Sequence, residues 1–294
     1  MGKNQKMLEE ASFSKLLLNL CLPTILIMLV MVIYNMADTF FIGQTGDPVK
    51  IAAISLCAPL FSVLSGLGTL FGSGGCTAVS LALGKKETAR IKAYTSLCCC
   101  GSLFIGFLFL LIVLLAVKPI SLALGADGDT LSLTCSYLRI IALGAPVILF
   151  NNVFANIIRA DGAAKESMIA NILGTLSNIG LDALFILVFS WDVAGAALAT
   201  VFGNLISCCY LLYYILKKQP AFSLHPKFLS LKKEILLPVT TLGLPLACST
   251  LLMSISSMIS NRLMMGYGPV ALAAQGVAGK IGMLLSMLAM GICM

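Results

Sequence analysis

Charged residues are scarce in this sequence. Only 11% of its 294 residues are Asp, Glu, Lys or Arg, whereas 59% are hydrophobic, and the mean hydropathy is +1.02. A soluble domain of this length cannot bury so many apolar side chains, because its surface needs polar cover. The scarcity of charge therefore indicates an integral membrane protein.

Motifs for metal, nucleotide and catalytic chemistry are also missing. The sequence has a single histidine, His225, and no cysteine pair shares metal-ligand spacing with it. The 11 cysteines fall in apolar runs, where a free thiol behaves as a small hydrophobic side chain. No Walker A loop is present, so ATP is not a direct energy source in this chain. We therefore predict that the protein is not an enzyme, holds no metal centre and has no cofactor.

Long apolar runs dominate what remains. About 20 apolar residues in helical form cross ~30 Å of hydrocarbon, and these runs are too long and too continuous for the alternating strands of a membrane barrel. The expected fold class is an all-α polytopic membrane protein. Spans are predicted at residues 16–42, 51–81, 91–117, 131–157, 167–190, 194–216, 236–264 and 271–294. Five glycines between residues 66 and 75 predict that the second span packs closely against its neighbours.

Lys and Arg are distributed unevenly over the connections between these spans. With the N-terminus inside, the outer connections keep only Lys50 and Lys118, and this asymmetry predicts a cytoplasmic N-terminus in the cell (inner) membrane. The net charge of +7 then reflects topology, and a nucleic-acid partner is not indicated. The cations assigned to the inner side are Lys3, Lys6, Lys15, Lys85, Lys86, Arg90, Lys92, Arg159, Lys165, Lys217, Lys218, Lys227, Lys232 and Lys233.

The sequence repeats itself after the longest basic connection. Cys-Leu-Pro at 21–23 is echoed by Gly-Leu-Pro at 243–245, and the turn and alanine pair at 46–53 are echoed at 268–274. Parallel repeats of this kind indicate a transporter of six plus six helices. The second copy stops early, so the chain is expected to be truncated, with its last two helices docking poorly or leaving a face exposed. The predicted division is an N-lobe of six transmembrane helices at 1–216, a cytoplasmic connector at 217–235 and the start of a C-lobe at 236–294.

Two carboxylates lie inside predicted spans, Asp38 in Leu16–Ile42 and Asp182 in Ser167–Ser190. An ionisable residue in a membrane span costs roughly 2.5–3.5 kcal/mol on insertion scales, so it is a functional-site hypothesis by default. The alternative is a structural role, in which the carboxylate lies near a helix end and reaches headgroup water, or forms a hydrogen bond to a neighbouring helix.

Several motifs in order resemble the MATE (multidrug and toxic compound extrusion) family, in its DNA-damage-inducible-like prokaryotic branch. They are Pro23 followed by Asp-Thr-Phe-Phe-Ile-Gly at 38–43, Arg-Ala-Asp-Gly at 159–162, and Asn-Ile-Gly-Leu-Asp at 178–182. The resemblance covers essentially the whole chain and departs from the family in length, because about four helices of the second lobe are missing.

The resemblance implies an antiporter that is driven by H+ or Na+ and exports drugs or other amphiphilic organic compounds. The coupling cation, which is the only metal expected, would be handled in the first lobe, and Pro23 matches the bending point of the first helix. The positions that match the family's coupling site are Asp38, Tyr137, Asn178, Asp182 and Thr200.

Depth along the helices supports one shared site without reference to the family. At ~1.5 Å per residue, Asp38 lies ~12 Å and Asp182 ~15 Å from the outer turns that follow them. Thr200 and Tyr137 reach a similar depth, and Asn178 lies one helical turn from Asp182 on the same face. We therefore expect these groups to meet in the outer half of the membrane.

The sequence indicates less about the substrate than about the coupling cation. The resemblance implies cationic amphiphilic small molecules as partners, in a monomeric protein within the lipid bilayer. Met and aromatic side chains suit adaptable pockets, although at helical spacing they also simply pack. The residues expected to line the cavity are Met31, Tyr34, Asn35, Phe61, Asn152 and Asn156.

Two other functions stay open from the sequence alone. The chain is either an active transporter or an inactive fragment of one, and a related lipid-linked oligosaccharide flippase is a further alternative. A flippase would favour a cationic cavity and lack the aspartate motif at Asp38.

Overall fold

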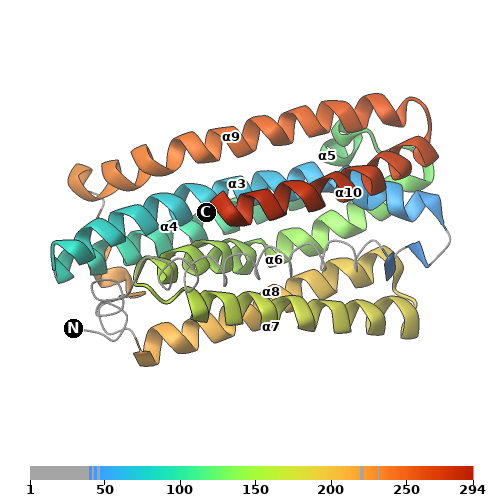
Figure 1. The fold of residues 1–294 in the computed structure, drawn as a ribbon. Helices are drawn as coiled ribbons and strands as arrows, with labels where there is room; N and C mark the ends of the chain where they lie inside the picture. Colours follow the sequence, from blue (N-terminus) through green and yellow to red (C-terminus); the bar gives the residue numbers. More distant parts are fainter. Residues whose placement is uncertain (1–39, 42, 45–46, 219–221, 231, 294) are drawn as a thin grey trace.

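The computed structural model describes residues 40–41, 43–44, 47–218, 222–230 and 232–293, which form a bundle of long helices (Figure 1). The helices and helical turns are α3 (Pro48–Gly84), α4 (Thr88–Leu115), α5 (Val117–Leu124), α6 (Gly128–Ala160), α7 (Ala164–Asp182), the π-helical turn η1 (Ala183–Val188), α8 (Asp192–Lys218), the 3-10 turn η2 (Pro226–Phe228), α9 (Lys233–Met265) and α10 (Pro269–Cys293). In Figure 1, α9 and the α7–α8 pair lie on opposite sides of the bundle.

Six of these helices are long and apolar enough to cross a membrane: α3, α4, α6, α7 together with η1, α8 and α9. The α10 helix contains a shorter apolar stretch, Val270–Gly279. Each span predicted from residue 51 onward corresponds to one helix, which confirms the all-α polytopic fold class. Most of the predicted span 16–42 lies outside the described residues.

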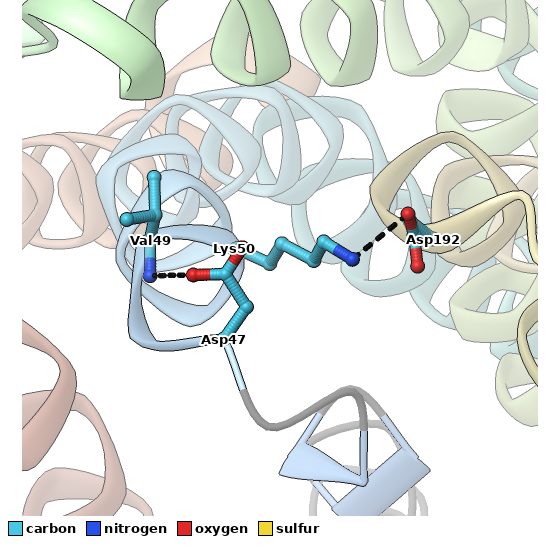
Figure 2. Close-up of polar contacts among 4 residues, drawn as sticks. All are labelled: Asp47, Val49, Lys50 and Asp192. Atoms are coloured by element: carbon cyan, nitrogen blue, oxygen red, sulfur yellow. Dashed lines mark hydrogen bonds and ion pairs between the residues drawn. The ribbon is translucent and has the colours of Figure 1, made fainter.

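Local sequence explains where the helices begin. Asp47 accepts a hydrogen bond from the backbone N–H of Val49 at 2.9 Å, which caps α3, and Pro48 occupies the first turn, where its missing N–H costs nothing (Figure 2). A capping box between Asp127 and Thr130 starts α6 in the same way. The sequence did not predict the short helix α5, which ends at Leu124 and is followed by Gly125 with a φ of +98°.

The connections define two ends of the bundle. The Lys50 end contains the beginnings of α3 and α8 and the ends of α4 and η1. The Lys92 end contains the ends of α3, α6 and α8 and the beginnings of α4, α7 and α9 (Figure 1).

Helix α9 crosses α3 closely. A Cβ atom on Gly74 would lie 2.0 Å from the carbonyl oxygen of Val239, and one on Gly243 would lie 2.0 Å from that of Leu70. Only glycine allows two helix backbones to approach this closely. The close packing predicted for the glycine-rich span is therefore present, and of the two outcomes expected for the repeated half, poor docking or an exposed face, α9 does not show the first. That helix nevertheless exposes large apolar side chains such as Leu252 and Met253.

Candidate functional site

Helices α7 and α8 face each other with stripes of polar side chains. Within each stripe the residues are spaced by three or four, so they share one face of the helix. We call these residues the polar stripes: Asn171, Thr175 and Asn178 on α7, and Thr200, Asn204 and Ser207 on α8.

The polar stripes line a cavity of about 130 Å³, which is room for several water molecules. Helix α3 contributes Phe61 and Ser65 to its wall, and α6 contributes Ile148, Asn151 and Asn152. Most of the residues that line this space thus carry an amide or hydroxyl group, although it lies between apolar spans. Oxygen atoms of this kind are suitable ligands for water or a hard cation.

Hydrogen bonds order part of this wall. The Ser207 hydroxyl donates to Asn151 Oδ1 at 2.8 Å, and Asn151 Nδ2 donates to Asn204 Oδ1 at 3.0 Å. Asn204 Nδ2 in turn donates to the carbonyl oxygen of Thr200 at 2.8 Å. This chain of bonds joins α6 to α8 and holds the side chains in place beside the cavity.

Asn178 stands apart from this network. Its side chain is 3% exposed, and neither Oδ1 nor Nδ2 has a hydrogen-bond partner within the part of the chain that the structure describes. A buried polar group without a partner costs roughly 1–3 kcal/mol. Gly203 brings α8 against this residue, because a Cβ there would lie 2.8 Å from Asn178 Cβ. The amide is therefore buried at a helix crossing and faces a cavity large enough for a ligand.

Asp182 lies one helical turn beyond Asn178 and is 0% exposed. It is the last residue of α7, and the π-helical turn η1 begins directly after it. The N–H of Phe189 bonds the carbonyl oxygen of Leu184 in the wider i to i+5 pattern. Such turns are rare and occur frequently at functional sites.

Apolar side chains replace the polar stripes toward the Lys50 end. Ile186 and Ala196 are buried there, and Ile51, Ile54 and Tyr137 pack against them. We call these five residues the apolar plug. Beyond it Lys50 Nζ lies 2.9 Å from Asp192 Oδ2, with side chains 20% and 37% exposed (Figure 2). This ion pair joins the beginnings of α3 and α8.

The structure places the predicted site residues as follows. Asn178 and Thr200 line the same cavity, and so do Phe61 and Asn152, which were expected to contact substrate. Asn156 is not among the described lining residues; its Oδ1 accepts a hydrogen bond from Arg159 at 2.7 Å, near the Lys92 end. Tyr137 belongs to the apolar plug. Asp38, Pro23, Met31, Tyr34 and Asn35 lie outside the described residues.

Four residues of the polar stripes were not predicted from the sequence. The site was predicted from charged residues within apolar spans, and that criterion does not detect neutral polar side chains. The residues it misses are Asn171, Thr175, Asn204 and Ser207. The spacing of polar residues along residues 171–178 and 200–207 is the signal that identifies them. Within the described ranges, no group of three or more His, Cys, Asp or Glu residues is arranged to hold a metal ion.

The chain belongs to the MatE family, whose model matches residues 23–184. It is 33% identical over 285 residues to the multidrug export protein MepA of Staphylococcus saprophyticus, and 32% identical over 285 residues to MepA of Staphylococcus aureus. Both alignments cover 97% of this chain and 63% of the relative. The chain therefore spans 63% of the length of these relatives.

Solved structures agree with this assignment. The MATE multidrug transporter DinF-BH superposes with a TM-score of 0.89 at 26% identity, covering 95% of this chain and 63% of that one. A MOP superfamily transporter from Pyrococcus furiosus, described as having a binding pocket of reverse polarity that suggests a different function, gives a TM-score of 0.87 at 28% identity. That match covers 99% of this chain and 65% of the other.

Proposed function

We propose that this chain takes part in the export of cationic amphiphilic compounds across the cell membrane by an antiport mechanism coupled to H+ or Na+. Its relatives are multidrug export proteins of the same family, which supports a transport function. The proposal concerns the activity of the full transporter, because this chain spans 63% of the length of those relatives.

One observation carries the proposal. Asn178 is a buried amide without a partner in the described part of the chain; it faces a polar cavity and is one turn from the buried carboxylate of Asp182. A site that only packed helices together would be expected to satisfy this amide internally, since buried polar groups are normally bonded. A coupling cation with its water molecules supplies the missing partners.

The chemistry of the site suggests how coupling works. A proton on Asp182, or Na+ bound between Asp182 and Asn178, neutralises the carboxylate, and the Thr200 hydroxyl adds an oxygen ligand for Na+. A cationic substrate is attracted to the same negative charge, so cation and substrate compete. In this proposal Asp38 and Tyr137 belong to the same site, and Pro23 provides a bend in the first helix because proline weakens the helical ladder.

The Lys92 end is proposed to face the cytoplasm, together with the N-terminus. Lys85, Lys86 and Lys92 lie at this end, whereas Lys50 and Lys118 lie at or near the other. An excess of Lys and Arg on one side of a polytopic protein marks the cytoplasmic side. We propose that the transporter acts as a monomer.

The coupling proposal is tested in proteoliposomes under an imposed H+ or Na+ gradient, with a fluorescent organic cation as substrate. Asp182→Asn should abolish gradient-driven transport, because the side chain can no longer lose or gain the charge. Asp129→Asn, which alters an exposed carboxylate in the first turn of α6, is the matched control and should retain it. Transport by Asp182→Asn at the unsubstituted rate would refute the proposal.

A second comparison asks whether this chain transports by itself. The chain and a version extended by the remaining C-terminal third of a relative are reconstituted side by side. Transport by the extended version alone means that the cation site is not sufficient without those helices. A flippase is less well supported, because none of the described residues that line the cavity is charged.

A further inference from the structure

The connection between α8 and α9 is held against the beginning of α4. Thr95 Oγ1 donates to the carbonyl oxygen of Ser223 at 3.1 Å and accepts from its N–H at 3.1 Å. The Ser96 hydroxyl donates to the carbonyl oxygen of His225 at 2.9 Å. We call residues 222–229 the strap; these bonds fix its backbone across the Lys92 end.

The two ends of the strap differ in exposure. Phe222 is buried in the same apolar core as Tyr94 and Leu97 of α4. Phe228 and Leu229, beyond the hydrogen-bonded segment, are 47% and 38% exposed. One part of the strap therefore anchors it to the bundle, and the other presents two large apolar side chains outward.

Four lysines surround these exposed apolar side chains or follow them in sequence. Lys92 Nζ lies 5.5 Å from the centroid of the Phe228 ring, a cation–π contact. The acidic groups nearby are few: Glu87 pairs with Arg90, and Glu234 lies in the first turn of α9. No ion pair to any of the four occurs within the described residues. We call them the basic cluster: Lys92, Lys227, Lys232 and Lys233.

We propose that the strap is an anchor in the plane of the membrane surface, in which Phe228 and Leu229 enter the interface and the basic cluster binds anionic lipid headgroups. Aromatic and aliphatic side chains beside lysines are typical of segments that lie on a membrane. A second cation–π pair lies at this end of the bundle, because Lys217 Nζ is 4.9 Å from the ring centroid of Tyr213. Tyrosine beside lysine is typical of the membrane–water interface. The inference rests on the cytoplasmic orientation proposed above, because the cytoplasmic leaflet carries the anionic lipids.

The chain has one tryptophan, Trp191, at the Lys50 end, which makes a direct test simple. In the Trp191→Phe, Phe228→Trp variant, the only indole reports on the strap. The full chain is reconstituted with brominated phosphatidylglycerol or brominated phosphatidylcholine, and quenching of the indole gives the relative binding of the two lipids. We expect a preference of at least about fivefold for the anionic lipid, since one basic residue near an anionic surface supplies about that factor.

Charge variants make the test specific. Lys92→Gln, Lys227→Gln, Lys232→Gln and Lys233→Gln together should bring the preference close to equality, whereas Lys118→Gln, which alters an exposed lysine on α5, should leave it unchanged. High salt should lower the preference of the single-tryptophan protein without any lysine change, because surface electrostatics are screened.

Three results would overturn the anchor. They are equal quenching by the two lipids before any lysine is changed, absence of quenching at position 228 while Trp191 of the unsubstituted chain is quenched, and a loss of the preference on adding inorganic phosphate that NaCl of the same ionic strength does not cause. The last result would indicate a site for free phosphate instead of a lipid surface. Because no transport is measured, a failure here leaves the coupling proposal standing. Absence of quenching at Trp191 itself would refute membrane insertion and the anchor together.

Discussion

The space between α3 and the α7–α8 pair is lined by the same helices along its length but by two different kinds of side chain. Between residues 61 and 65 of α3 and the polar stripes, it contains a polar cavity. Nearer the Lys50 end the apolar plug packs between α3, α6, η1 and α8, and the Lys50–Asp192 ion pair lies beyond the plug. The bundle therefore has a polar region and an apolar region within a few helical turns of each other.

The boundary between these regions falls at the candidate cation site. Asn178 and Thr200 are the last polar residues of their stripes, and one turn further Asp182 and Ala196 follow on the same faces. Among the described residues, the Asn178 amide has the polar cavity on one side and, toward the Lys50 end, the buried carboxylate of Asp182 followed by the apolar plug. In the coupling proposal, the apolar plug is a barrier between the cation and the Lys50 end.

The largest effect is expected from forcing the α7–α8 crossing apart. In Gly203→Leu the new Cβ would lie 2.7 Å from the carbonyl oxygen of Gly174, a backbone atom that cannot move aside. We expect a loss of about 3 kcal/mol, the upper part of the range for overpacking. Unfolding followed by circular dichroism in micelles measures it. Gly180→Leu on the exposed side of α7, where a Cβ meets nothing within 4 Å, is the control, and a loss of equal size there would contradict the reason given.

Substitution by leucine should change the stability of the protein in opposite directions at two asparagines of the cavity. Asn204→Leu removes a partner of Asn151 and should destabilise the protein by about 2 kcal/mol. Asn178→Leu removes an amide without a partner in the described part of the chain and should leave stability unchanged or raise it by about 1 kcal/mol. It should also abolish any thermal stabilisation by Na+. If Asn178→Leu is the more destabilising of the two, the amide has a structural partner, and the polar cavity has a packing role instead of a binding role.

The start of α3 sets the position of Lys50. Asp47→Ala should cost about 1 kcal/mol, because the N–H of Val49 loses its cap. Asp47→Asn keeps a capping oxygen and should lose much less. Thermal unfolding compares the three proteins, and equal losses in both variants would exclude capping as the cause.

The smallest effect on stability is expected at the ion pair. Lys50→Gln should cost about 0.5 kcal/mol, since partly exposed pairs contribute little. It should nevertheless raise the reaction of Ala196→Cys with an impermeant thiol reagent severalfold, quantified by mass spectrometry on the peptide that contains residue 196. Exchange of the two charges, Lys50→Asp with Asp192→Lys, should restore protection. Unchanged labelling in Lys50→Gln would mean that the plug alone closes this end.

Much of this arrangement was predictable from the sequence because lipid imposes simple rules. Apolar length placed α3, α4, α6, α8 and α9, and helical rise and face brought Asn178 and Thr200 to one depth. The coupling roles of these residues, of Asp182 and of the residues before Phe40 stay predictions. The helix α5 and the turn η1 were not predicted, because hydropathy does not distinguish a short helix or a wider turn from the span beside it.

The turn η1 has a consequence for how this protein tolerates change. A π-helical turn holds one residue more than an α-helical turn, and each residue of an α-helix rotates the chain by about 100°. Deleting Ala183 or Leu184 would leave the chain connected but turn Phe185 and Trp191, whose rings stack at 5.3 Å, away from their present direction relative to Asp182. The extra residue in η1 therefore determines the orientation of the aromatic side chains near the end of this span relative to the buried carboxylate. The two ends of the span can face different neighbours.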